Sequence, residues 1–194
     1  MELLHPLLRK LAHLLRIGLI ANILLLSSVL QAGEFIVKEA SAQLTETQLQ
    51  SNAVFDLRLN NTVNEALHNG IPITLSTRLS LFRKRLLIWN ENIATWQQKH
   101  VISYHSLSDR YQLNSSHSDG TRSYASIGEV LNQIESFSLT SELIRQTMPS
   151  STRGYQLKLL IRLDIEALPP ALRIVAYASS TWRIKSPARV WSIE

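Results

Sequence analysis

The residues that most often carry catalysis are sparse in this chain, as the histidines show. Four histidines lie beyond residue 33: His68, His100, His105 and His117. None of them has the HExxH spacing that places two zinc ligands on one face of a helix. His117 and Asp119 are close enough in sequence to share a metal, but the surrounding SSHSDG stretch is typical of a solvated turn. We therefore predict no metal centre and no cofactor.

Nucleophiles and paired carboxylates give equally weak signals. The chain has no cysteine, which excludes thiol catalysis, iron–sulfur clusters, cysteine zinc sites and disulfides. It also lacks the G-x-S-x-G serine motif. His105, Ser106 and Asp109 are neighbours in sequence, whereas catalytic triads are usually assembled from distant segments. Asp164 and Glu166 would share a strand face, where a surface charge ladder is the simpler interpretation. The sequence therefore predicts no catalytic residue.

One polar and aromatic segment is a candidate binding surface. It reads YHSLSDRYQL over residues 104–113, and tyrosine and arginine are favoured in recognition surfaces. The residues that could line a groove there are Tyr104, His105, Arg110 and Tyr111. The alternative is that the two tyrosines pack in a sheet while the charged side chains are solvated.

A second candidate is the strongest cluster of positive charge, LFRKRLLIW over residues 81–89. Arg83, Lys84 and Arg85 could contact anionic lipid headgroups, with Trp89 at the membrane interface. The alternative is a strand end whose charges guard against edge-to-edge aggregation.

These candidates follow an export or anchor segment at residues 1–33. Residues 17–30 carry no charge, and as a helix they would span roughly 21 Å. A bilayer core is about 30 Å thick, so a signal peptide fits better than a membrane span. Arg9, Lys10 and Arg16 precede the apolar run, which keeps the N-terminus in the cytoplasm. Cleavage after Ala32 would release a periplasmic domain, whereas an uncleaved leader would anchor that domain to the inner membrane.

Composition indicates that residues 34–194 form one domain of ordinary size. Without the leader's four charged side chains, 17 basic and 14 acidic residues remain, a net charge of +3. This modest charge and the expected export argue against a nucleic-acid partner. Because no disulfide is available, packing alone must hold the domain together.

The exported part is predicted to be mainly β. Residues 70–82 and 155–165 alternate between apolar and polar side chains at most positions, which predicts long antiparallel strands with one solvated face. Shorter strands are expected at residues 34–42, 54–60, 100–105, 110–113, 137–144 and 173–178. Pro169 and Pro170 would end the second long strand.

Two capping boxes predict two short helices. One starts at Thr62 with Glu65 three residues later, and Gly70 lies where a C-terminal glycine belongs. The other starts at Ser126 with Glu129, and its helix runs to about residue 135. We therefore predict a single domain built from an antiparallel sheet or β-sandwich with two short helices; an α+β fold is the alternative.

Four segments carry a family resemblance, in this order and at this spacing: NEALHNGIPITLSTRLSLFRKR, HVISYHSLSDRYQL, RSYASIGEVLNQI and RLDIEALPPALRIVAYASSTWRIKS. Together they resemble the DUF4390 family of exported proteobacterial proteins over residues 34–192. The resemblance implies no activity or ligand. Members tend to be encoded beside a ribosomal RNA methyltransferase and a two-component sensor kinase, which suggests an envelope or signalling role.

Two classes of function remain. The first is a non-catalytic envelope domain that binds a protein, a peptide or an anionic lipid surface. The second is a hydrolase-like enzyme with a site that no motif reveals. An enzyme should have a deep pocket with convergent ionisable groups, whereas a binding domain should have an exposed apolar patch or a free sheet edge. The missing motifs favour the first class.

Overall fold

The computed structural model describes residues 33–45, 48–85, 90–117, 120–142 and 154–193. The chain divides into two compact units, Met1–Gln31 and Ala32–Glu194, and every described residue belongs to the second. Residues 1–32 of the predicted leader lie outside the described residues, so its cleavage or retention stays a prediction. Within the described part, no helix has the length and apolar character needed to cross a membrane.

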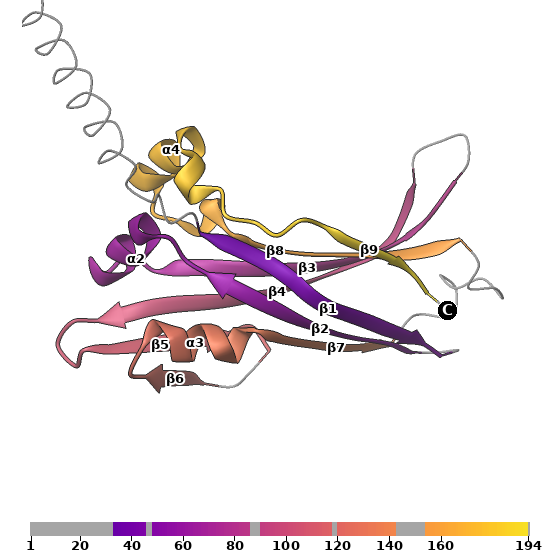
Figure 1. Cartoon of the computed structure of the whole chain (residues 1–194), viewed down its shortest axis with the longest axis horizontal. Helices are drawn as coiled ribbons and strands as arrows, with labels where there is room; N and C mark the ends of the chain where they lie inside the picture. The colour runs from indigo at the N-terminus through magenta and orange to yellow at the C-terminus, as the bar shows by residue number, and fades with distance from the viewer. Residues whose placement is uncertain (1–32, 46–47, 86–89, 118–119, 143–153, 194) are drawn as a thin grey trace, which may run out of the picture. The chain divides into compact units, whose positions relative to one another are not determined.

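The larger of two sheets has six antiparallel strands in the order β6-β5-β4-β3-β8-β9 (Figure 1). The two long alternating segments of the sequence form the neighbouring strands β3 and β8 inside this sheet, with Leu79 opposite Leu159. The strands are β3 (Ile73–Arg83), β4 (Glu91–His105), β5 (Arg110–Ser115), β6 (Thr121–Tyr124), β8 (Tyr155–Leu163) and β9 (Arg189–Ser192).

The smaller sheet has three antiparallel strands in the order β1-β2-β7. They are β1 (Glu34–Leu44), β2 (Gln48–Arg58) and β7 (Ser136–Glu142). A β-bulge between Val37 and Glu39 shifts the register of β1 against β2. The extra residue of the bulge reverses which side chains face inward. Before it the odd-numbered Phe35 is buried, and after it the even-numbered Ala40 packs on the core.

The two sheets face each other across one core, which confirms the predicted sandwich-like, mainly β fold. Apolar side chains from both sheets form a single buried cluster. The Trp96 indole on β4 donates a hydrogen bond to Ser141 Oγ on β7 at 2.9 Å, which links the two sheets directly. The predicted inward residues of β8 are all buried: Tyr155, Leu157, Leu159, Ile161 and Leu163.

The opposite face of β3 is less solvated than its alternation predicts. Thr74 and Ser76 are buried, and the Gln97 amide on β4 donates to Ser76 Oγ at 2.8 Å. Neighbouring side chains of the sheet cover this part of the outer face, which sequence periodicity alone does not reveal.

Both predicted helices form, with one change of cap. Helix α2 (Asn61–His68) is capped by Asn60, whose side chain accepts from the Val63 N–H, rather than by Thr62. Asparagine is among the strongest N-cap residues, which explains the earlier start. Gly70 follows the helix with φ +82°, a conformation that glycine adopts without strain. Helix α3 (Ile127–Ile134) begins as predicted, with Ser126 Oγ accepting from the Glu129 N–H.

The predicted strand at residues 173–178 is wrong, because this segment lies in a third helix, α4 (Pro170–Ala178). Pro170 occupies the first helical turn, where its missing N–H costs nothing and its fixed φ suits a helix. The strand before it already ends at Leu163. Short 3₁₀ turns flank α4, namely η2 (Ile165–Ala167) and η3 (Ser180–Trp182). Strands β6 and β9 were also missed.

Candidate functional site

Helix α4 exposes an unusually apolar outer face. Ile174, Val175 and Tyr177 are 77%, 57% and 54% exposed. The only charged residue of the helix is Arg173, which is half-buried and donates from Nε to the Leu168 carbonyl at 2.7 Å. A solvated helix normally presents polar residues to water. The outer face of α4 therefore has the character of a covered surface.

A pocket that we call the cationic pocket lies between the end of β8 and the chain that follows α4. Its open volume is about 400 Å³. Its lining includes three basic and no acidic side chains: Arg162, Arg183 and Lys185, together with Ser180 and the apolar Leu163, Ile165 and Ile184. The backbones of Arg162 and Lys185 form an antiparallel bridge, which holds two of these cations close together.

None of these three cations forms an ion pair with another residue of the described part. The nearest acidic residue in sequence is Asp164, which is buried and pairs with Lys99 Nζ at 2.9 Å. Its charge is therefore already balanced from the β4 side. The pocket keeps an uncompensated positive charge that suits an anion.

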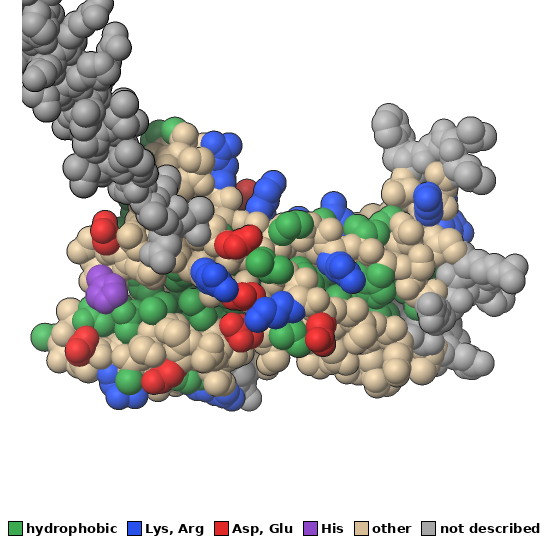
Figure 2. Space-filling model, viewed as in Figure 1, with side chains coloured by type: hydrophobic (Ala, Val, Ile, Leu, Met, Phe, Trp, Pro, Cys, Tyr) green, Lys and Arg blue, Asp and Glu red, His purple; other side chains and the backbone are tan. Residues whose placement is uncertain are grey.

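The wall of the cationic pocket touches the first described residue of the chain. A Cβ built on Gly33 would lie 2.6 Å from Ile184 Cδ1 and 2.9 Å from the Asn60 backbone nitrogen. Asn60 also donates from its side chain to the Thr181 carbonyl at 2.7 Å. Gly33 thus packs tightly against the segment that carries Arg183 and Lys185. In Figure 2 the visible part of α4 carries a small hydrophobic area, and basic and acidic side chains lie beside it.

The predicted recognition segment folds as the β4–β5 hairpin and only partly forms one site. The rings of Tyr104 and Tyr111 lie 5.1 Å apart, with Tyr111 buried. His105 and Arg110 pair across the two strands but are exposed, away from the buried ring of Tyr111. Arg110 donates to Ser123 Oγ at 3.0 Å. The two tyrosines therefore pack in the sheet, as the alternative interpretation had it.

The sequence missed His68, which completes this aromatic cluster from the end of α2. Its ring lies 4.8 Å from Tyr104. Its Nδ1 is 3.0 Å from the Asn64 carbonyl, which can only accept, so Nδ1 carries a proton. In the neutral ring Nε2 accepts from the Tyr111 hydroxyl at 2.8 Å. No sequence signal pairs a helix end with a strand 43 positions later.

The supposed triad residues do not converge. Asp109 accepts a hydrogen bond from the Tyr104 hydroxyl at 2.7 Å, and this bond raises the pKa of Tyr104, with burial adding to the effect. His105, Ser106 and Asp109 are all exposed. His117 is also exposed, and Asp119 lies outside the described residues. Among the described residues no group of three or more histidines and carboxylates could hold a metal ion.

Two cations of the predicted lipid-binding cluster are already paired. Arg83 and Arg85 both donate to the carboxylate of Glu91. The hydrogen bond from Arg83 lowers the pKa of Glu91 and raises that of Arg83. Lys84 is exposed, and Trp89 lies outside the described residues. The proposed lipid contact of this cluster stays a prediction, but part of its charge is neutralised locally.

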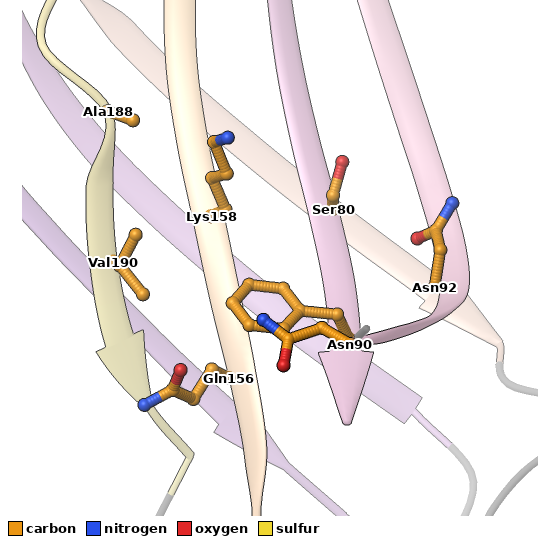
Figure 3. Close-up of a pocket in the computed structure, with 8 residues that line it drawn as sticks. Ser80, Asn90, Asn92, Gln156, Lys158, Ala188 and Val190 are labelled. Atoms are coloured by element: carbon orange, nitrogen blue, oxygen red, sulfur yellow. The ribbon is translucent and has the colours of Figure 1, made fainter. Parts of the chain in front are cut away.

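A larger depression of about 590 Å³, which we call the outer trough, crosses the outer face of the six-stranded sheet. Figure 3 shows its lining side chains spread over neighbouring strands, with Lys158, Ser80 and Asn92 from β8, β3 and β4. Lys158 is its one ionisable lining residue. A single amine without an acidic partner offers no acid–base pair.

The fold and these surfaces define a two-sheet, mainly β domain with a cationic pocket beside an exposed apolar helix. A family model described as a domain of unknown function (DUF4390) matches residues 32–192, and the chain belongs to this family. The match confirms the resemblance seen in the sequence. No curated protein matches the chain, and no solved structure does.

Proposed function

We propose that this protein is an exported, non-catalytic domain that docks onto the outer surface of the inner membrane through the outer face of α4. The observation that carries the proposal is the exposure of Ile174, Val175 and Tyr177 on a helix with no exposed charge. Exposed apolar patches of this kind mark surfaces that contact a membrane or another protein.

The position of Gly33 also favours the end of the domain that carries α4 as the membrane-facing end. The apolar leader ends at Leu30, three residues before Gly33. Three extended residues reach about 10 Å. If the leader stays in the membrane, Gly33 must lie close to the bilayer surface, and Ile184 and the cationic pocket lie with it.

The basic cluster predicted from the sequence lies at the other end of the sheet. Arg83 pairs with Tyr155 at the start of β8, whereas α4 follows the end of that strand. The nine residues of β8 separate the two ends by roughly 30 Å. The two candidate membrane surfaces are therefore alternatives that one experiment can separate.

The free energy gained by burying the apolar face of α4 in a membrane is too small for strong binding by itself. Fully burying one apolar side chain of this size is worth roughly 1.5–3 kcal/mol. The domain already covers part of each of the three side chains, so a few kcal/mol in all is a reasonable scale. Stable attachment then needs a second contribution, from a retained leader or from charge.

The described pockets also favour binding over catalysis. The outer trough has one ionisable lining residue, and the cationic pocket has three of the same sign. General acid–base chemistry needs groups that can exchange a proton at working pH. No specific observation favours the hydrolase-like alternative. Turnover of any substrate that is lost when His105 or Asp109 is replaced in a folded variant would overturn the non-catalytic proposal.

A site-specific fluorescent label tests the docking surface. Because the chain has no cysteine, Ile174→Cys provides a unique attachment point for an environment-sensitive dye on the full-length protein in lipid vesicles. We expect blue-shifted emission that nitroxide-labelled lipids quench. Lys84→Cys is the matched position in the other candidate surface, and its label should report water.

The reverse pattern, with quenching at position 84 only, would make the basic cluster the membrane surface and overturn docking by α4. Labels that report water at both positions would remove the membrane as the occupant and leave a protein or peptide partner for the apolar face.

A further inference from the structure

We propose that the cationic pocket binds the phosphate of an anionic phospholipid headgroup, with Arg162, Arg183 and Lys185 as the phosphate-binding cations. This inference rests on the proposed docking of α4 at the membrane, and it assigns that surface a lipid class.

The three basic side chains come from two neighbouring segments and line one small volume. Arg162 rises from β8 on the face opposite the core residues Ile161 and Leu163, and it is half-buried. Arg183 and Lys185 come from the chain between η3 and β9 and are exposed. Arginine offers a planar fork of donors that matches phosphate oxygens, and lysine adds a compact point charge.

The pocket combines this charge with apolar walls. Ile165 and Ile184 line it beside the cations, and the Ser180 hydroxyl adds a further hydrogen-bond donor. A free phosphate ion gains nothing from an apolar wall, whereas a phospholipid brings a glycerol backbone and acyl chains next to its phosphate. The composition of the lining therefore favours a lipid phosphate over a soluble one.

The segments beside the pocket also favour a lipid ligand. Ile184 forms part of the pocket wall and also packs against Gly33, three residues after the apolar leader. The apolar outer face of α4 precedes the pocket-lining segment by only a few residues. A headgroup in the pocket and acyl chains along α4 would satisfy both surfaces with one molecule type.

The test compares two variants of equal net charge. The site variant replaces Arg162, Arg183 and Lys185 with glutamine. The control variant replaces three other exposed cations with glutamine: Arg122, Lys158 and Arg189. Full-length protein in neutral detergent is titrated with short-chain phosphatidylglycerol, and binding is followed by calorimetry. Zwitterionic phosphatidylcholine, inorganic phosphate and glycerol 3-phosphate are titrated in parallel.

We expect the site variant to lose at least tenfold in affinity for phosphatidylglycerol, and the control variant to change less than twofold. Binding by the native chain should weaken as salt rises, because two of the three cations are exposed. If the site variant melts early, the Arg183→Gln/Lys185→Gln double variant keeps the half-buried Arg162 and should still lose most of the affinity.

Equal losses in both triple variants would show diffuse charge attraction and overturn the pocket. Inorganic phosphate or glycerol 3-phosphate binding as tightly as the lipid, and with the same dependence on the pocket cations, would make the ligand a soluble phosphate and overturn the lipid assignment. Lipid binding that depends on the pocket while the label at position 174 reports water would keep the pocket and remove docking by α4. A quenched label at position 174, with all variants binding phosphatidylglycerol alike, would keep docking by α4 and remove the pocket.

Discussion

His100 and His105 lie on the same strand in opposite environments. Five residues apart on β4, they face opposite sides of the sheet; His100 is 7% exposed, whereas His105 is solvated. The His100 Nδ1 lies 2.7 Å from Ser115 Oγ. Burial, aided by the charge of His117, lowers the pKa of His100 to about 4. The folded protein therefore favours the neutral ring.

The depressed pKa of His100 predicts a loss of stability in acid. Between pH 6.5 and 4 the unfolded chain binds a proton at His100 that the folded chain does not. The stability that comes from this difference in proton binding is fully present above pH 6.5 and is lost as the pH falls toward 4. A shift of this size corresponds to on the order of 3 kcal/mol. The amide of His100→Gln can still bond to Ser115. Between pH 7 and pH 4 we expect this variant to lose about 3 kcal/mol less stability than the native chain, measured by urea unfolding.

His105→Gln is the matched control on the same strand. Its side chain is exposed, so the variant should follow the native pH dependence. Parallel curves for the native chain and His100→Gln would mean that His100 titrates in the folded state as it does in the unfolded state.

At the scale of elements, periodicity predicted β3 and β8 well, but it missed the first part of β2 and of β4 and assigned one short apolar segment wrongly. Strands β3 and β8 alternate at most positions, with Thr77 and Leu160 among the exceptions, and the apolar residues of their inward faces are buried as expected. The six residues 173–178 are too short and too uniformly apolar to distinguish a strand from a helix by period. Pro170 carried the missing information, because a proline at the first helical position signals a helix start.

The two faces of β8 predict a sharp difference in the free energy of unfolding between variants at adjacent residues. Leu159 is fully buried opposite Leu79, so Leu159→Asp places an unpaired charge in the core and should cost several kcal/mol. Lys158 is exposed on the other face, and Lys158→Asp should change the free energy of unfolding by less than about 0.5 kcal/mol. Chemical denaturation of both variants measures the difference. Similar losses in the two variants would contradict the assignment of the faces.

At the scale of the whole molecule, the sequence predicted the fold class but not the candidate site. Alternation and capping act within one element, and both can be read locally. The cationic pocket instead joins Arg162 to Lys185 through a backbone bridge between segments 23 positions apart. Sequence distance says nothing of such a pairing. The basic run at Arg83 to Arg85 was conspicuous because its charges are adjacent in sequence, yet Glu91 pairs with two of them in the fold.

Export is the prediction on which the membrane proposals depend. The charge order around residues 17–30 predicts that the domain crosses the inner membrane. A fusion of residues 1–40 to a reporter active only outside the cytoplasm should therefore give signal, and a silent reporter would contradict export. The same fusion with Arg9, Lys10 and Arg16 replaced by acidic residues is the control and should lose most of the signal.

Mass analysis of the native protein then decides how the domain is held. Gly33 is the first residue with described contacts, so cleavage after Ala32 would leave the contacts to Ile184 and Asn60 intact. A mature chain that begins at Gly33 would depend on α4 and the cationic pocket for attachment, and high salt should release it from membranes because its charge contribution is screened. A chain that keeps its leader should stay in the membrane fraction at any salt concentration, since an inserted apolar segment does not depend on charge. Cleaved protein that resists salt would show that neither the leader nor the pocket cations account for attachment.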